Sequence, residues 1–391
     1  MKIKIVLALL FAFILSGCVG TPDSDGWRSA QKDEFLKILD TDKYLSICNQ
    51  QALYAKVKQS RNSQLMSRLL LAYTKNLANG CIVNGTGEYK QTVSSSNIKM
   101  QLKAGQSIEK ILKPYVPEYR QFNELIAKYR LTNDLKSKRK IRLNIERIKV
   151  LKPGLGKTYA LVNIPEYIIR VIENDKVSIK MKVVVGKKNH MTPIFSADLK
   201  YITLNPTWNV PDSIARHEII PKALKNPAYL KSHRLVMRKD YSLDSPALSF
   251  NPELARKYVG GEGYVPFKFI EVPSNRNALG RVKFIFPNHH SVYMHDTPAK
   301  RLFKRKKRAF SHGCVRLHRP KDMLEFVSKN YTAHDYADVT AKYNSRKTHY
   351  LKITKRLPVH TAYLTTYVND CGELLSFDDP YGYDKSQKLN F

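Results

Sequence analysis

A strand-like run followed by a sharp turn at a cysteine is the feature that most constrains this chain. In the run Ser291–His295, the two-residue period of a strand points Tyr293 and His295 to one face. The later turn reads Ser-His-Gly-Cys and ends at Cys314, and Gly313 lets the backbone bend sharply because glycine has no Cβ. We therefore expect an aromatic ring and an imidazole side by side at a strand end, with a thiol nearby in sequence.

These residue types are those of nucleophilic catalysis. A thiol nucleophile needs a base that takes its proton and donors that hold the oxyanion. Cys314 is the candidate nucleophile, and His295 and His312 are both candidate bases. The backbone N–H groups of Gly313 and Cys314 are candidate oxyanion donors, with Tyr293 as a further candidate. The alternative, a buried structural thiol, leaves the adjacent His-Gly pair unexplained.

Three residues are candidates for holding a substrate rather than for reacting with it. Arg316 carries a planar guanidinium that suits a carboxylate, so it could orient either the loop or the substrate. Tyr293 is a substrate-binding candidate by its position on the strand. Trp208 could line a substrate groove, and packing in a core explains it equally well.

The same segment carries a family resemblance. His-Asp-Thr, a gap, and then Ser-His-Gly-Cys-Val-Arg resembles the signature of the L,D-transpeptidases, whose catalytic domain is of the YkuD type. Three further blocks follow the family's order. They lie at residues 152–165, 205–211 and 277–284, and the resemblance spans roughly residues 143–368.

The resemblance implies a fold and a ranking of the two histidines. It implies a mainly β, β-sandwich-like catalytic domain with a mixed lid insertion at about residues 212–268, as in the larger members. It implies that His295 is the base and that the backbone carbonyl of Asp296 fixes its tautomer. His312 is then a supporting residue. No metal and no organic cofactor are implied.

The implied substrate is a peptidoglycan stem peptide. Cys314 would attack the third residue of a tetrapeptide stem and expel D-alanine, and an amine from a neighbouring stem would complete a 3–3 cross-link. Water as the acceptor would make the enzyme an L,D-carboxypeptidase, and a protein lysine would attach a lipoprotein to the wall. Carbapenems are expected to acylate Cys314. The alternative of another class is a basic wall-binding lipoprotein without catalysis.

Hydrophobic periodicity divides the chain. Residues 33–150 predict a helical N-terminal region, in which Leu65, Leu69, Tyr73 and Leu77 recur at helical spacing. From Thr158 the period becomes that of strands, so we assign residues 151–370 to the catalytic domain. Residues 371–391 are expected to be an exposed C-terminal tail.

The first eighteen residues predict an exported protein. Two lysines precede an apolar run from Ile5 to Leu15, which is short for a membrane span and typical of a secretory signal. Leu-Ser-Gly-Cys then resembles the bacterial lipobox, so Cys18 is the expected lipidation site and residues 19–32 a tether. An ordinary signal peptide is the alternative. We expect a periplasmic protein anchored in a membrane, with Val19 favouring the outer membrane.

The charge and the remaining cysteines fit that compartment. A net charge of +34 implies an anionic environment, and without a nucleic-acid motif we expect wall polymer or envelope surface rather than nucleic acid as the partner. Cys48 and Cys81 could form a disulfide in an oxidising compartment. Cys371 is then left over.

Overall fold

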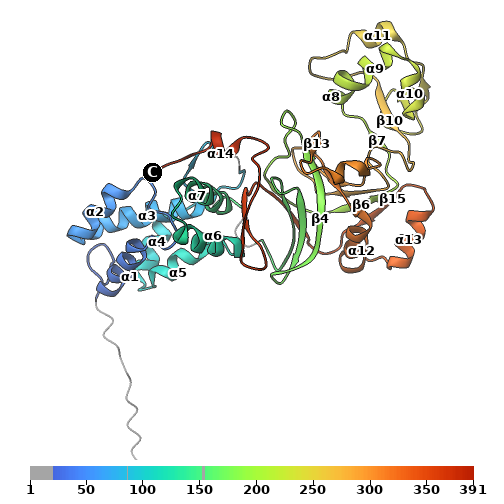
Figure 1. Cartoon of the computed structure of the whole chain (residues 1–391). Helices are drawn as coiled ribbons and strands as arrows, with labels where there is room; N and C mark the ends of the chain where they lie inside the picture. Colours follow the sequence, from blue (N-terminus) through green and yellow to red (C-terminus); the bar gives the residue numbers. More distant parts are fainter. Residues whose placement is uncertain (1–20, 86, 152–154) are drawn as a thin grey trace, which may run out of the picture. The chain divides into compact units, whose positions relative to one another are not determined.

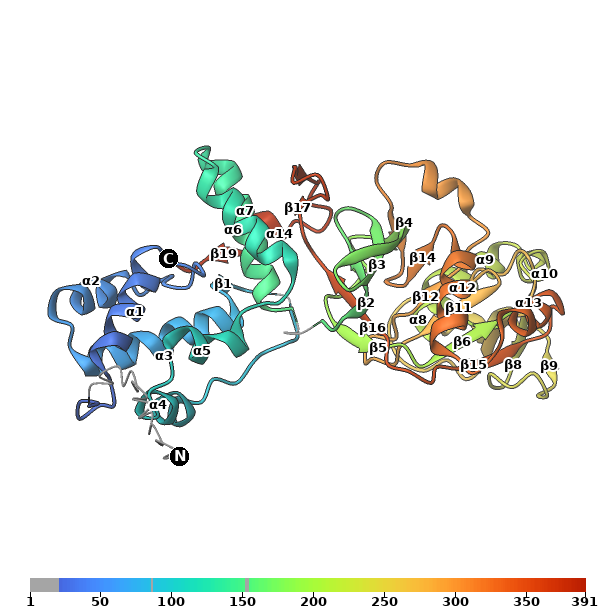
Figure 2. The same cartoon turned by 90° about the horizontal axis from the view of Figure 1, so that it is seen from below.

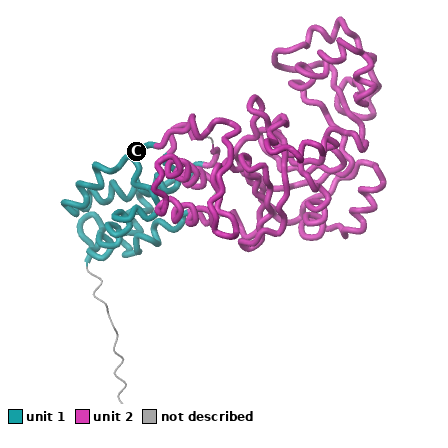
Figure 3. Tube along the Cα trace, in the orientation of Figure 1, with its two compact units in different colours: residues 1–81, 90–116, 390–391 teal, residues 82–89, 117–389 magenta. Residues whose placement is uncertain are grey.

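The computed structural model describes residues 21–391 apart from residues 86 and 152–154. The predicted signal segment and Cys18 therefore lie outside the described residues. The chain forms two compact units: one holds residues up to 81, 90–116 and 390–391, and the other holds residues 82–89 and 117–389 (Figure 3). Within the described part of the chain, no helix combines the length and the apolar character needed to cross a bilayer.

The first unit is helical and has an aromatic core. The ring of Trp27 lies 5.8 Å from that of Phe35, which in turn meets Tyr73 edge-on at 6.3 Å. A disulfide joins Cys48 to Cys81, as the sequence allowed. The helices are α1 (Ser29–Asp40), α2 (Gln51–Ser60), α3 (Ser63–Asn79), α4 (Ser95–Lys103) and α5 (Ile108–Leu112), followed by the 3₁₀ turn η1 (Lys113–Tyr115). Polar caps begin three of them, because Asn62, Ser94 and Ser107 each accept a hydrogen bond from the first turn.

Two more helices, α6 (Arg120–Leu131) and α7 (Leu135–Lys149), belong to the second unit. Charges buried on α7 are paired, as burial requires: Glu146 accepts from Arg142 at 2.7 Å and from Lys149 at 3.1 Å. Arg147 of the same helix forms an ion pair with Asp384 at 2.7 Å. The helices predicted for residues 33–150 are present, and the structure divides them between the two units. The predicted tether of residues 19–32 is wrong from Trp27 onward, because Trp27 is buried in the helical core and α1 begins at Ser29.

The second unit is built on a curled sheet of eleven strands, which confirms the mainly β catalytic domain. Its path runs β15-β6-β11-β12-β14-β4-β3-β2-β16-β5, with β13 added to β4. The strands are β2 (Thr158–Asn163), β3 (Ile168–Glu173), β4 (Lys176–Gly186), β5 (Ser196–Asp198), β6 (Tyr201–Leu204), β11 (Val282–Ile285), β12 (Met294–His295), β13 (Ala309–Ser311), β14 (Val315–Leu317), β15 (His349–Lys352) and β16 (Pro358–Ala362).

Local sequence explains why these segments are strands. In β4 the apolar Ile179 and Val183 alternate with lysines that are exposed, the pattern of a half-buried strand. At the β15 end of the sheet, α12 (Pro320–Tyr331) and α13 (Tyr336–Asn344) lie beside β6 and β15 (Figures 1 and 2). The 3₁₀ helix η3 (Lys300–Lys304) lies between β12 and β13 in the chain.

The mixed insertion expected near residues 212–268 has a hydrophobic core of its own. Its sheet runs β7 (Trp208–Asn209), β10 (Lys268–Glu271), β8 (Leu235–Arg238), β9 (Ala247–Leu248). Its helices are α8 (Asp212–Ile214), the π-helix η2 (Ala215–Ile219), α9 (Ile220–Lys225), α10 (Ala228–Ser232) and α11 (Pro252–Arg256) (Figure 1). Ile220, Val265 and Phe269 are completely buried in its core. We call residues 208–271 the insertion.

The C-terminal segment, residues 371–391, is not simply an exposed tail as predicted, because two of its residues are buried. Tyr381 is 5% exposed and Gln387 1%. Here β17 (Thr366–Val368) pairs with β18 (Leu374–Ser376), and after α14 (Tyr383–Ser386) the short β19 (Lys388–Leu389) pairs with β1 (Ile82–Val83). The polar composition of this segment suggested exposure to solvent. Its polar groups instead have partners within the protein, among them Asp384 with Arg147.

Candidate active site

Three neighbouring strands bring the catalytic candidates to one face of the large sheet. The antiparallel pair β11–β12 sets Lys283 opposite His295, and the parallel pair β12–β14 sets His295 beside Arg316. Two residues earlier, just before the paired Met294 and Val315, the same parallel register places Tyr293 beside Cys314. Residues paired across strands, and residues two apart along one strand, share a face of a sheet. These five residues form what we call the site face.

The imidazole of His295 has a fixed tautomer. Its Nδ1 lies 2.5 Å from the carbonyl oxygen of Asp296, which can only accept, so Nδ1 carries the proton and Nε2 the lone pair. Burial and the nearby charge of Arg316 together lower the pKa of His295 to about 3, although the Asp296 carbonyl opposes them. His295 is therefore a neutral base at physiological pH, and the contact expected from Asp296 is present.

The carboxylate of Asp296 anchors this strand end. Its Oδ1 accepts from the Thr297 N–H and from the Lys300 ammonium, each at 2.7 Å, and its Oδ2 accepts from the Arg281 N–H at 2.9 Å. Gly280 is needed beside it: a Cβ there would come within 2.4 Å of the carboxylate. The carbonyl that orients the imidazole is thus held by the side chain of its own residue.

The thiol of Cys314 is partly exposed and is protonated at rest. Its Sγ lies 3.9 Å from the carbonyl oxygen of Ser291. Burial raises the pKa of the Cys314 thiol, while hydrogen bonding from Tyr293 and the charges of Lys283 and Arg316 lower it. With His295 also neutral, the resting pair is a thiol and a neutral imidazole.

Two cations border the thiol. The ammonium of Lys283 lies 3.9 Å from the ring centroid of Tyr293, and burial lowers its pKa while Cys314 opposes that shift. Arg316 is also buried in large part, and its Nε has no hydrogen-bond partner among the residues that the structure describes. Sequence reasoning missed Lys283, because a lysine between the alternating Val282 and Phe284 resembles the solvent-facing half of a strand.

Hydroxyl groups hold the corner that carries the thiol. The hydroxyl of Ser311 donates to the Cys314 carbonyl at 2.5 Å and accepts from the Gly313 N–H at 3.2 Å, and Thr192 donates to the Gly313 carbonyl at 2.7 Å. Gly313 has a φ of +111°, which favours glycine there. The Gly313 N–H already donates to the Ser311 hydroxyl. It can therefore donate to an oxyanion, as predicted, only when that hydrogen bond is broken.

The C-terminal segment supports the same corner. The hydroxyl of Tyr381 donates to the Gly186 carbonyl at 2.8 Å and accepts from the Thr192 N–H at 3.0 Å. The Gly186 N–H donates in turn to the Thr192 hydroxyl at 2.9 Å. Sequence reasoning missed Thr192 and Tyr381, because nothing in the local pattern links segments about 190 residues apart.

His312 contacts the insertion. Its Nε2 lies 2.6 Å from a carboxylate oxygen of Glu218 in η2, and its ring lies 4.8 Å from that of His190. Burial lowers the pKa of His312 and Glu218 opposes that change. Burial favours a raised pKa for Glu218, but His312 together with the charges of Lys222 and Lys187 outweighs it and lowers that pKa. Because its Nε2 contacts Glu218, His312 fits a supporting role, and this contact does not position it as the base for Cys314.

Trp208 lies in β7 of the insertion and packs against the hydrophobic core there. It pairs with Glu271 across β7 and β10. This is the packing role that the sequence left open beside substrate binding, and the groove role stays a prediction.

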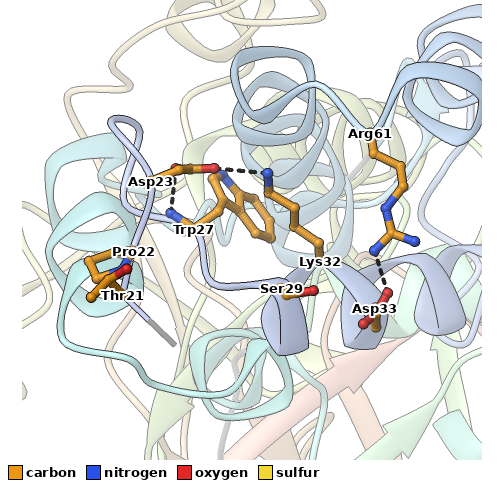
Figure 4. A pocket seen from close by; sticks show the side chains of 8 residues that line it. All are labelled: Thr21, Pro22, Asp23, Trp27, Ser29, Lys32, Asp33 and Arg61. Carbon is orange, nitrogen blue, oxygen red and sulfur yellow. Dashed lines mark hydrogen bonds and ion pairs between the residues drawn. The ribbon is translucent and has the colours of Figure 1, made fainter. Parts of the chain in front are cut away.

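The helical unit holds an open depression of about 670 Å³ (Figure 4). In it Asp23 accepts from Lys32, and Arg61 forms an ion pair with Asp33. None of its lining residues is a predicted catalytic residue; they are Thr21, Pro22, Asp23, Trp27, Ser29, Lys32, Asp33 and Arg61.

Comparison with known proteins agrees with this geometry. Residues 157–334 match the family model described as the YkuD L,D-transpeptidase catalytic domain. Residues 157–334 are thus similar to an L,D-transpeptidase catalytic domain, over less than half of the chain. Over 253 residues the chain is 28% identical to a curated Haemophilus influenzae protein whose name assigns it to the L,D-transpeptidases. The match covers 64% of this chain and 49% of that relative, so the chain aligns with about half of the relative's length.

Solved L,D-transpeptidases also align with this chain, with low identity and low TM-scores. L,D-transpeptidase 3 from Mycobacterium tuberculosis, in complex with a faropenem-derived adduct, is 12% identical with a TM-score of 0.25, over 53% of this chain and 60% of that one. An Enterococcus faecium L,D-transpeptidase is 10% identical with a TM-score of 0.24, over 75% and 82%.

Proposed function

We propose that this protein is a peptidoglycan L,D-transpeptidase that forms 3–3 cross-links through a cysteine acyl-enzyme. The observation that carries the proposal is the site face, where a tautomer-fixed neutral imidazole, a thiol and two cations share one side of three paired strands. A structural thiol would need none of these neighbours. The family of the catalytic domain supports the same chemistry.

The first step is acylation. As Cys314 Sγ attacks the carbonyl carbon of the third stem residue, Nε2 of His295 takes the thiol proton, so that a C–S bond forms and the carbonyl oxygen becomes an oxyanion. Collapse breaks the C–N bond to D-alanine. The imidazolium returns its proton to the departing amine, which leaves a thioester and a neutral imidazole.

The second step transfers the acyl group to an amine of a neighbouring stem. His295 removes a proton from the attacking nitrogen, a C–N bond forms, the C–S bond breaks and the thiol is restored. Water entering in place of the amine would release a tripeptide, which is the carboxypeptidase outcome. Lys283 and Arg316 would favour a stem carboxylate and the negative charge of the oxyanion, because both are cations beside the thiol.

The test is mass spectrometry of disaccharide-tetrapeptides incubated with the purified chain. Transpeptidation predicts cross-linked dimers and free D-alanine, and carboxypeptidation predicts tripeptide alone. A carbapenem should add one covalent mass to the wild-type chain and none to Cys314→Ser. The absence of dimers, of tripeptides and of the adduct would contradict an enzymatic role and favour the wall-binding alternative.

We also propose, from the sequence, that the chain is lipidated at Cys18 and anchored to a membrane facing the periplasm. In a bacterial host, a palmitate analogue should label the chain and should not label Cys18→Ala. Label retained in that variant would rule out the lipobox.

A further inference from the structure

A small cluster outside the site face has the composition of a transition-metal site. The imidazole Nε2 of His289 lies 3.0 Å from Oε1 of Glu88, and the Nε2 of His290 contacts the same oxygen. One ligand atom from each residue lies within 4.8 Å of the other two. Glu88 is about two hundred residues from the histidines in sequence, so spacing motifs could not reveal the group.

We propose that Glu88, His289 and His290 bind a zinc ion, a site beyond the proposed transpeptidase function and independent of it. Two imidazole nitrogens and one carboxylate oxygen are a known donor set for zinc with an open position. Ligands bound to one tetrahedral zinc ion stand about 3.3 Å apart, given metal–ligand distances of roughly 2.0–2.1 Å. The 3.0 Å between Nε2 of His289 and Oε1 of Glu88 is already close to that separation.

The backbone around the cluster is firmly held. Asn288 accepts from the N–H groups of His290 and Val292 at 3.1 Å each, and its amide donates to the carbonyl of Phe286 at 2.6 Å. The ring of His290 lies 5.3 Å from that of Phe195. A metal ligand positioned by such contacts loses little conformational entropy on binding.

A backbone contact of its neighbour holds Glu88 near the histidines. A β-bridge pairs Gly87 with Ile194, the residue before Phe195. Both ligand segments are thereby fixed against one short stretch of chain. The His289 side chain is 72% exposed and that of His290 27%, so an ion can enter from solvent and keep water in its remaining positions.

The donor atoms of the site favour a metal ion that binds both nitrogen and oxygen ligands. One carboxylate and two neutral imidazoles would surround a dication in a chain of net charge +34, in which acidic groups are scarce. Mg²⁺ and Ca²⁺ prefer all-oxygen sites, whereas zinc accepts imidazole nitrogen. The chemistry therefore points to zinc rather than to a hard cation.

The experiment is a zinc titration of the full chain, freed of metal and with its disulfide kept oxidised, against a coloured chelator. Cys314→Ser and Cys371→Ser are introduced together so that no free thiol competes for the ion. We expect one zinc ion per chain, unaffected by excess Mg²⁺. His289→Ala and Glu88→Gln should each weaken binding by at least about tenfold.

The matched control is His334→Ala, which removes a histidine paired with a carboxylate, Asp338, elsewhere on the same unit. It should leave zinc affinity unchanged. His289→Ala is the decisive variant because its side chain is largely exposed, and zinc should raise the melting temperature of the parent chain but not of this variant. No binding at about 100 µM free zinc, or binding that survives both His289→Ala and Glu88→Gln, would overturn the site.

Discussion

At the scale of single residues, the two candidate bases differ in what their ring nitrogens contact. Nδ1 of His295 is committed to the Asp296 carbonyl, while Nε2 of His312 contacts Glu218 in the insertion. We expect His295→Ala to slow acylation of Cys314 by about 10²–10⁴-fold, the usual contribution of a general base. His312→Ala should cost less than about tenfold by comparison.

The measurement is the rate at which a carbapenem acylates each purified variant, followed by mass. Cys314→Ser is the control in which no acylation is expected. Equal losses in the two histidine variants would reverse the ranking, and intact acylation in His295→Ala would remove His295 from the mechanism.

Lys283 should tune the pH range of the reaction. Its charge lowers the pKa of the Cys314 thiol and also that of His295. Lys283→Met removes that charge, so both pKa values rise. The alkaline limb of the acylation profile, set by the thiol, should move to higher pH, and the rate at neutral pH should fall.

Lys180→Met is the matched control, because Lys180 is an exposed lysine on β4. Acylation rates measured from pH 4 to pH 10 separate the two variants. A profile for Lys283→Met that overlays the parent chain would show that the cation is only packing against Tyr293.

At the scale of elements, strand identity could be predicted from the sequence and strand pairing could not. The alternation of apolar and polar residues in β4 and β11 predicted these strands. The His-Asp-Thr and Ser-His-Gly-Cys-Val-Arg blocks predicted Cys314 and His295 as site residues. Which residue faces the thiol depends on register, and β11 joins β12 and β6 through pairings that local patterns do not encode. Lys283 was missed for that reason.

The C-terminal segment is the second element that the sequence could not place. Its polar composition resembles a tail, and its hydrogen bonds connect it to residues nearly two hundred positions earlier. A polar segment becomes structural when its polar groups replace water with fixed partners. Only the folded sheet supplies those partners for Tyr381.

Tyr381→Phe should therefore loosen the corner that carries the thiol. The change keeps the ring and leaves the Gly186 carbonyl and the Thr192 N–H without their shared hydroxyl. Two buried backbone groups lose a partner, so we expect a stability loss of about 1–3 kcal/mol and slower carbapenem acylation. Urea melts and acylation rates measure the two effects.

Tyr383→Phe is the control from the same segment, since its hydroxyl contacts only the Met191 sulfur, at 3.4 Å, among the hydrogen bonds of the described residues. It should leave both quantities near those of the parent chain. If Tyr381→Phe matches this control, the C-terminal segment does not support the corner.

At the scale of the whole molecule, the disulfide and the candidate nucleophile lie in different compact units. Cys48 and Cys81 join the helices of the first unit, and Cys314 lies in the second. The exposed Cys371 remains a free thiol. The oxidised pair and the reduced candidate nucleophile are thus in separate parts of the fold.

Two tryptophans let each unit be followed separately. The chain contains two in all, and they fall one to a unit: Trp27 in the helical core and Trp208 in the insertion. With Trp208→Phe, fluorescence reports the helical unit alone, and with Trp27→Phe it reports the other. Urea unfolding can thus be assigned to a unit without dividing the chain.

Replacing both Cys48 and Cys81 by serine should destabilise the Trp27 transition selectively. The crosslink closes a loop with a sequence separation of 33. Loop-closure entropy for that length predicts a loss of about 3–4 kcal/mol. The Trp208 transition and the acylation of Cys314 should not change. Cys371→Ser is the control, with no expected shift in either transition. A shift of both transitions by the double replacement would mean that the two units unfold as one, because the disulfide can act directly only on the unit that contains it.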